Sequence, residues 1–318
     1  MVRRGGCGYN QGMQTAVKHE LLVRYLDSGA PTMLHSSKAV TYAEGYADAP
    51  DSTAVAALRV FGEFADLLAG RRLSMVLIGA DPRRLDALTA RLAVLHKELG
   101  APPWLDVRAV PGTCEEQLVP ALTESRALTA PLLVYLNAVG AQPPSIELLS
   151  AIAAGRSSEV LVALDPVDPG GRRELMKRSG FGFVAEVELV GDDGSGELLL
   201  FGTSSDKHLD KFKDTLWAVD EFAGVRYRDP RDSEHSLLDI SLSPHLIPLR
   251  RALVERLSRG DEYTVAELRR YARDETIYRS TDAVRALGSM LSAGILGRRP
   301  DRGRLTAETS IRLTEHAR

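Results

Sequence analysis

The feature that most constrains the fold of this chain is an alternation of short apolar runs with amphipathic stretches over residues 38–164. Ser74–Gly79 (SMVLIG), Pro131–Leu136 (PLLVYL) and Glu159–Leu164 (EVLVAL) are continuous apolar runs, which is typical of strands buried on both faces. Pro82 opens a stretch in which leucines recur at helical spacing. Such an alternation predicts βαβ units and a parallel, doubly wound sheet.

The remaining elements follow the same rhythm. Strands are expected at Lys38–Ala43, Ser74–Gly79, Leu105–Val110, Pro131–Leu136 and Glu159–Leu164, and helices at Lys18–Leu26, from about Ser52, from Pro82, at Cys114–Thr123 and at Ser145–Ala153. Asp165–Gly171 (DPVDPGG) is expected to be a loop. Phe183–Val190 and Glu197–Thr203 are joined by a short turn and must be antiparallel neighbours. The predicted fold class is therefore α/β, a class I methyltransferase-like doubly wound sheet with an antiparallel edge pair.

The chain changes character after Pro244. Three further helices and a hairpin are expected: Leu246–Leu257, Val265–Arg273 behind a Thr264/Glu267 capping box, a helix capped by Ser280 or Thr281 and ended by Gly294, and strands at Ile295–Leu296 and Leu305–Leu313. This order predicts a winged helix-turn-helix. The expected domains are residues 1–240, a methyltransferase-like Rossmann domain with its N-terminal helix, and residues 241–318, a winged helix domain.

Composition excludes several classes of protein. The 318 residues are 44% hydrophobic and 26% charged, which argues against a disordered tail or a rod. No window approaches 18 consecutive apolar residues, and no apolar segment follows the basic start, so we expect no membrane span, no secretory signal and a cytoplasmic protein. Cys7 and Cys114 cannot form a disulfide framework or a four-ligand zinc site, and the seven histidines show no metal-binding spacing. Cys114 is expected to be a buried structural cysteine.

Charge is distributed unevenly along the chain. Residues 246–318 carry a net charge of +5 and the remainder carries −8, an asymmetry expected of a module that contacts nucleic acid. Asp274, Glu275 and Asp282 lie close by in sequence and would oppose phosphates, so docking of nucleic acid and docking of a protein both stay open. The candidate nucleic-acid-binding residues are Arg279 and Arg285 beside the recognition helix, and Arg298, Arg299, Arg302 and Arg304 in the wing.

Several stretches together resemble the three-Cys-motif partner protein family (TcmP). They are KHELLVRYL, VTYAEGYADAP, PLLVYLNAVG and LLLFGTSSDKHLDKFKDTLWAVD, of which Leu199–Asp220 is the most specific. Members of that family carry a lysine before L-x-x-Y-L, D-x-F-A-G-P-G after the first strand and D-P-F-G after the fourth. The resemblance implies a methyltransferase-like fold, a partner protein with a three-cysteine motif, and S-adenosylmethionine as the cofactor whose motif is degraded here.

The turn after the first strand departs from the family pattern. It reads Glu44–Pro50 (EGYADAP), in which Gly45 remains and Asp48 and Pro50 replace the other small positions. A cofactor needs a glycine-rich turn there so that backbone N–H groups can approach it closely.

Three other strand ends depart as well. Gly79 stands where an acidic residue would bind the ribose hydroxyls, with Asp81 two residues later, Thr113 replaces the acidic residue near the adenine, and D-P-F-G becomes Asn137–Gly140. The candidate cofactor-binding residues are Glu44, Gly45, Asp48, Asp81, Thr113 and Asn137, and Asn137 is also the candidate catalytic residue.

Three functions follow from these observations. The first is a degenerate, partner-like binding protein with an eroded S-adenosylmethionine crevice. The second is an active S-adenosylmethionine-dependent enzyme that acts on nucleic acid or on a nucleotide-like small molecule. The third is a DNA-binding regulator whose Rossmann body senses a ligand.

Overall fold

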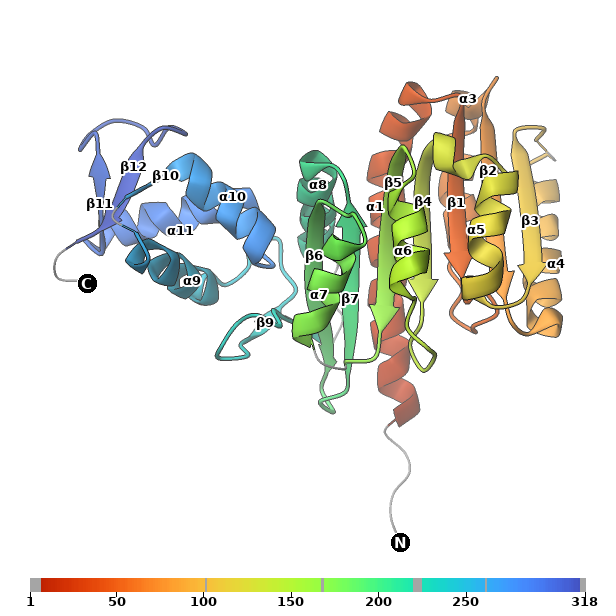
Figure 1. Cartoon of the computed structure of the whole chain (residues 1–318), viewed down its shortest axis with the longest axis horizontal. Coiled ribbons are helices and arrows are strands. Elements are labelled where there is room, and N and C mark those ends of the chain that lie inside the picture. Colours follow the sequence, from red (N-terminus) through yellow and green to blue (C-terminus); the bar gives the residue numbers. More distant parts are fainter. Residues whose placement is uncertain (1–6, 101, 167–168, 220–224, 261, 315–318) are drawn as a thin grey trace, which may run out of the picture.

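The computed structural model describes residues 7–100, 102–166, 169–219, 225–260 and 262–314. Within these residues, nine strands form one sheet in the order β3-β2-β1-β4-β5-β7-β6-β8-β9 (Figure 1). Its strands are β1 (Ala39–Gly45), β2 (Arg72–Gly79), β3 (Leu105–Pro111), β4 (Pro131–Asn137), β5 (Ser157–Leu164), β6 (Phe183–Gly191), β7 (Gly196–Thr203), β8 (Val225–Arg228) and β9 (Leu237–Asp239).

The sheet has the methyltransferase-like Rossmann arrangement that the sequence predicts. Strands β3, β2, β1, β4 and β5 run parallel, so that Gly45 in β1 lies opposite Ile78 in β2 and Leu136 in β4. Strand β7 is antiparallel to β5, and β6 is antiparallel to β7, which confirms the predicted edge pair. Strands β8 and β9 extend the sheet beyond that pair and were not predicted, because strands of four and three residues are too short to show a hydrophobic period.

Helices cover both faces of this sheet (Figure 1). They are α1 (Cys7–Ser36), α2 (Ala54–Glu63), α3 (Ala65–Leu68), α4 (Pro82–Glu98), α5 (Cys114–Glu124), the 3₁₀ helix η1 (Ala127–Thr129), α6 (Ile146–Ala153), α7 (Pro169–Arg178) and α8 (Asp206–Ala218). Alternate strand residues serve different faces: Tyr42 belongs to the core under α1, α2, α4 and α8, and Ala43 to the core under α5, α6 and α7. The strands therefore read as continuous apolar runs because both of their faces are buried.

Two helices differ from the sequence prediction. Helix α1 has 30 residues, far more than Lys18–Leu26, and it continues through Pro31. Helix α7 begins at Pro169, inside the predicted loop Asp165–Gly171, of which residues 167–168 lie outside the described residues. The loop prediction was wrong there because proline fits the first turn of a helix as well as it fits a turn.

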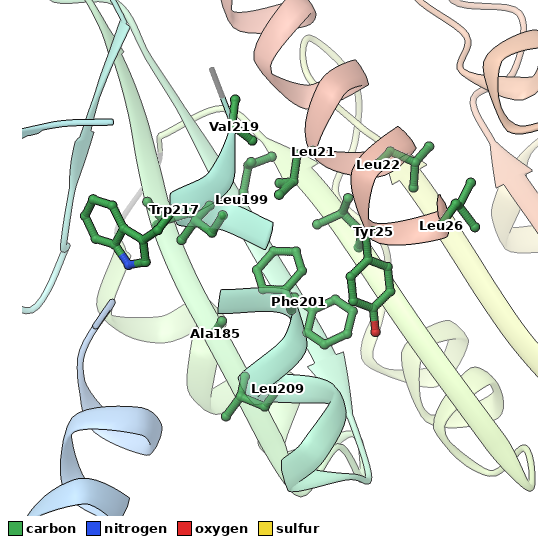
Figure 2. Close-up of a cluster of buried hydrophobic side chains, with 14 of the residues drawn as sticks. Leu21, Leu22, Tyr25, Leu26, Ala185, Leu199, Phe201, Leu209, Trp217 and Val219 are labelled. Atoms are coloured by element: carbon green, nitrogen blue, oxygen red, sulfur yellow. The ribbon is translucent and has the colours of Figure 1, made fainter. Parts of the chain in front are cut away.

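Aromatic side chains join α1 and α8 to the antiparallel part of the sheet (Figure 2). Tyr25 of α1 contacts Phe201 of β7 edge-on with ring centroids 5.3 Å apart, and Phe201 stacks on Phe212 of α8 at 4.2 Å. The Tyr25 hydroxyl donates to Glu159 of β5 at 2.7 Å. Because such pairs stabilise beyond their buried area, this cluster fixes α1 across the sheet.

The C-terminal elements form a separate small sheet with its own helices. They are α9 (Ile247–Ser258), β10 (Tyr263–Thr264), α10 (Val265–Glu275), α11 (Ser280–Ser292), β11 (Leu296–Arg299) and β12 (Ser310–Leu313), with the antiparallel strand order β10-β12-β11. The predicted capping box of Thr264 and Glu267 is present at α10. Arg279, and not Ser280 or Thr281, is the N-cap residue of α11, because the Asp282 carboxylate accepts from the backbone and the guanidinium of Arg279.

The turn between α10 and α11 is fixed on helix α8. The fully buried Lys213 of α8 lies within hydrogen-bond distance of two carbonyls at the end of α10, Ala272 at 3.4 Å and Arg273, and of two in the turn, Thr276 at 2.5 Å and Tyr278 at 3.0 Å. Trp217 Nε1 donates to the Ile277 carbonyl at 3.2 Å, and the Ile277 N–H donates to Asp229 at 2.8 Å. These bonds attach the C-terminal elements to the Rossmann body, and ion pairs of α10 add to them, such as Glu275 with Arg173 of α7 and Arg273 with Asp206 of α8.

In the part of the chain that the structure describes, none of the helices has the length and apolar character needed to span a bilayer.

Candidate functional site

The carboxyl ends of β1, β2 and β4 carry the predicted site residues. Asp48, in the turn after β1, lies over the end of β2: a Cβ added to Gly79 would be 2.9 Å from the Asp48 Cβ and 3.0 Å from its Oδ1. The Asp48 carboxylate accepts from the backbone N–H of Asp81 at 2.8 Å. Asp81 in turn accepts from Arg83 N at 2.9 Å and caps α4. The structure brings Asp48 and Asp81 together, and each carboxylate is engaged by backbone N–H groups.

Glu44 is buried beneath the same edge and belongs to a different network. Its carboxylate accepts from Thr53 N at 2.9 Å, from Thr53 Oγ1 at 2.7 Å and from the Tyr42 hydroxyl at 2.8 Å. Burial raises the pKa of Glu44, and the hydrogen bonds from Thr53 and Tyr42 oppose that rise. Glu44 therefore fixes the start of α2, where Thr53 is the N-cap residue.

Asn137, the candidate catalytic residue, lies in a third network at the switch point between β1 and β4. Its Nδ2 donates to Asp51 at 2.7 Å, and its Oδ1 accepts from Lys18 Nζ at 3.4 Å. Lys18, 1% exposed, also forms an ion pair with Glu197 of β7 at 2.8 Å. The amide and the amine of this network are thus both occupied by side chains of the protein itself.

Sequence reasoning missed Lys18, Asp51 and Glu197 as members of this network. They come from α1, the turn after β1 and the start of β7, so no local spacing links them. Lys18 alone carried a signal, since it is the lysine that precedes L-x-x-Y-L in the TcmP-like pattern.

Gly45 and Thr113 complete the predicted set. A Cβ on Gly45 would lie 2.6 Å from Cys114 Sγ and 2.6 Å from Leu136 Cδ2, so packing alone requires glycine there. Thr113 is exposed, and its hydroxyl donates to Glu116 at 3.0 Å. Cys114 is a buried free thiol whose pKa burial raises to about 12, which agrees with the structural cysteine that we expected and not with a nucleophile.

These side chains do not fit S-adenosylmethionine. Asp48 fills the space above Gly79 where the ribose hydroxyls of a cofactor would meet an acidic residue, and the turn that would cradle the cofactor carries Asp48 and Pro50 instead of glycine. The backbone of the turn is also tied to β2, because Ala47 N donates to Ile78 O at 2.8 Å. We therefore derive no methyl-transfer step from this edge.

Among the described residues, no group of three or more His, Cys, Asp and Glu side chains is arranged to bind a metal ion. Of the histidines, His208 pairs with the buried Glu159, and His316 lies outside the described residues. A cavity of about 780 Å³ lies away from the strand ends, between α9, α10 and the segment after β8. Its carboxylates are engaged in ion pairs and caps, as in Arg251–Asp232 and Arg259–Glu255.

The candidate nucleic-acid-binding arginines separate into two groups. Arg279 donates to Asp282 and to the Leu242 carbonyl at 2.9 Å. Arg298 donates to the carbonyls of Pro300 and Gly303, each at 2.9 Å, so it shapes the β11–β12 loop from within. The other candidates have exposed side chains: Arg285, Arg299, Arg302 and Arg304. Asp282, which was expected to oppose phosphates, is fully buried and faces Arg279 and Arg285.

No protein-family model matches the sequence, and no curated protein matches it significantly. Among solved structures, the chain is similar to EvdMO1 (11% identity, 62% of this chain and 44% of that one, TM-score 0.36). It is also similar to the METTL16 methyltransferase domain (13%, 56% and 66%, 0.34) and to a putative methylase of Haemophilus influenzae (12%, 60% and 98%, 0.33).

These likenesses concern the fold alone. The matched part spans less than half the length of EvdMO1 and of the citrinin polyketide synthase CMeT domain, at 44% and 46%. By its strand order, β3-β2-β1-β4-β5-β7-β6, the chain has a methyltransferase-like Rossmann fold, and strands β8 and β9 follow beside β6 in the same sheet.

Proposed function

We propose that this chain is a non-catalytic methyltransferase-like protein that acts by binding a partner. The observation that carries the proposal is the position of Asp48, whose side chain covers Gly79 and accepts from Asp81 N–H. A cofactor would have to displace that carboxylate and leave the Asp81 N–H without its acceptor. The Asn137 network supports the same proposal, because Asn137, Lys18 and Asp51 already satisfy one another.

The partner in this proposal is the three-cysteine-motif protein that the TcmP-like stretches imply, and the place of action is the cytoplasm. Gene neighbourhood gives a direct check, since a gene for a three-cysteine-motif protein beside this one is expected. A position inside a biosynthetic cluster would favour the enzyme alternative instead.

The C-terminal elements enter the proposal as a winged helix-turn-helix. Three helices and the antiparallel sheet β10-β12-β11 occur in the order that such a module requires. Its attachment through Lys213 and Trp217 makes it a rigid extension of the body.

Cofactor binding tests the non-catalytic assignment. The protein is melted with S-adenosylmethionine or S-adenosylhomocysteine at about 1 mM, a concentration that would add about 2.7 kcal/mol of stability if it were 100 times Kd. We expect an unchanged Tm and no heat of binding in calorimetry.

Three variants help to interpret the melting experiment. Asp48→Gly removes the side chain above Gly79, and Thr113→Val changes an exposed residue that joins no network at this edge. If the enzyme alternative is right, the wild type melts at a higher temperature with cofactor, and Asn137→Ala loses that shift.

A further inference from the structure

Four exposed arginines on the β11–β12 hairpin have no acidic partner in the described part of the chain. They are Arg299, Arg302, Arg304 and Arg312. Some other exposed or half-exposed arginines of the C-terminal elements do form ion pairs, as Arg251 does with Asp232 and Arg259 with Glu255. The same hairpin exposes two carboxylates, Asp301 and Glu308, so its arginines outnumber its exposed acidic residues. Such an excess of positive charge indicates a partner that brings negative charge.

The register of the hairpin separates these arginines from the core. Gly297 pairs with Arg312, and Arg299 pairs with Ser310. The alternate pairs are Leu296 with Leu313 and Arg298 with Ile311. Leu296, Ile311 and Leu313 are buried, so Arg299 and Arg312 belong to the outward face. Arg312 was not among the sequence candidates, because only its register against Gly297 places it on that face.

Helix α11 packs against β11 and adds a face without exposed carboxylates. Its core side holds Ala283, Leu287 and Met290, and its outward side holds Arg285 and Gly288. Gly288 costs a helix interior about 1 kcal/mol relative to alanine. Nothing within 4 Å of an added Cβ explains that cost, but close approach by a partner would.

We propose that the hairpin–helix face, made of Arg285, Gly288, Arg299, Arg302, Arg304 and Arg312, binds the backbone of duplex nucleic acid. Arginine guanidinium groups match phosphates in charge and in bidentate geometry. The inference goes beyond the proposed function, which concerns the strand-end crevice, and the two can fail independently.

The composition of the face distinguishes a duplex from other anionic partners. The sequence has no Phe, Trp or Tyr from Arg279 to Arg318, and single-stranded nucleic acid binds by stacking bases on such rings. Protein interfaces are usually centred on several large apolar or aromatic side chains. Within the described residues 279–314, Ile295 is the one large apolar side chain that is exposed, at 37%, so this face offers a protein partner little apolar surface.

Contacts to phosphates are expected to dominate over reading of bases. Arg279 and Ser280, at the start of α11, donate to Leu242 O at 2.9 Å and to Asp210 at 3.3 Å inside the protein. Binding should therefore vary little with sequence and strongly with salt.

The test measures binding of the full chain to a fluorescein-labelled duplex DNA of about 20 base pairs by anisotropy, between about 50 and 200 mM salt. Each neutralised phosphate contributes about −0.9 to the log–log slope, so four contacts lose about 100-fold in affinity over that range. The quadruple variant R299A/R302A/R304A/R312A should lose most of that slope while keeping its Tm.

A matched variant controls for net charge. R59A/R83A/R91A/K97A removes four exposed cations from α2 and α4 and should bind like the wild type. Equal slopes for the two quadruple variants, tighter binding of a single strand than of the duplex, or no binding at 50 mM salt would each overturn the proposal. None of these outcomes bears on cofactor binding.

Discussion

Replacing Gly45 with alanine is expected to destabilise the protein by about 2 kcal/mol, within the 1–3 kcal/mol typical of an overpacked core. The new Cβ would lie 2.6 Å from both Cys114 Sγ and Leu136 Cδ2, and both of those side chains are buried. Neither neighbour is the free end of a long, mobile side chain, so the strand or the start of α5 must move. Gly45 is the one glycine in the turn Glu44–Pro50 and was a candidate cofactor-binding residue, so the experiment separates a packing role from a binding role.

Urea unfolding followed by far-UV circular dichroism measures the change as a shift of the midpoint. Gly288→Ala is the matched control, because it adds the same methyl group where nothing lies within 4 Å, and it should stabilise by up to about 1 kcal/mol. The double variant G45A/C114A tests the named contact. Removing Sγ should recover part of the loss, with a coupling of about 1 kcal/mol.

The packing argument fails if Gly45→Ala leaves the midpoint unchanged. It also fails if the loss is the same with and without Cys114, because the strain would then lie elsewhere. A variant that keeps its stability but changes affinity for S-adenosylhomocysteine would return Gly45 to a cofactor site.

Two further changes test other parts of the structure. Lys213→Met leaves the carbonyls of residues 272–278 without their buried donor and should cost about 3 kcal/mol in urea unfolding, whereas the exposed Lys207→Met should change stability by less than about 0.5 kcal/mol. The hydrogen bond to Glu159 raises the pKa of His208 above its ordinary value. That contribution is complete below the ordinary histidine pKa of about 6.5 and is lost as the pH rises through the raised pKa. Stability should therefore fall less in His208→Gln than in the wild type as the pH is raised above about 6.5.

The central strands were predictable because a strand buried on both faces is a continuous apolar run, which can be recognised without knowing what it packs against. Residues 75–79 and Pro131–Leu136 are apolar throughout, and the structure places them in β2 and β4. Helix α1 was predicted too short because its ends owe their order to tertiary contacts, such as those of Gln14 with the carbonyls of Leu189 and Ser195. Those contacts span more than 170 residues and leave no periodic pattern.

The strand-end location of the candidate residues followed from topology, since parallel strands end at one edge of a sheet. Their partners did not follow. The sequence allowed four polar residues to converge in one crevice: Glu44, Asp48, Asp81 and Asn137. In the structure they make separate hydrogen bonds. Glu44 accepts from Thr53, Asp48 accepts from the Asp81 N–H, and Asn137 donates to Asp51. Each pairing depends on the path of a turn, which local propensity does not determine.

The same reasoning explains why a count of charges could not separate nucleic acid from protein as the partner of the C-terminal elements. Arg279 and Arg298 add to the net charge of the sequence, yet one caps α11 and the other holds the β11–β12 loop. Asp282 counts against phosphates in the sequence, yet it is buried beside Arg279. Once these internal pairs are removed, Arg299, Arg302 and Arg304 form no ion pair among the described residues, whereas Arg285 pairs with Asp282. A charged surface therefore indicates a binding partner only after the structure shows which of its charges are paired within the protein.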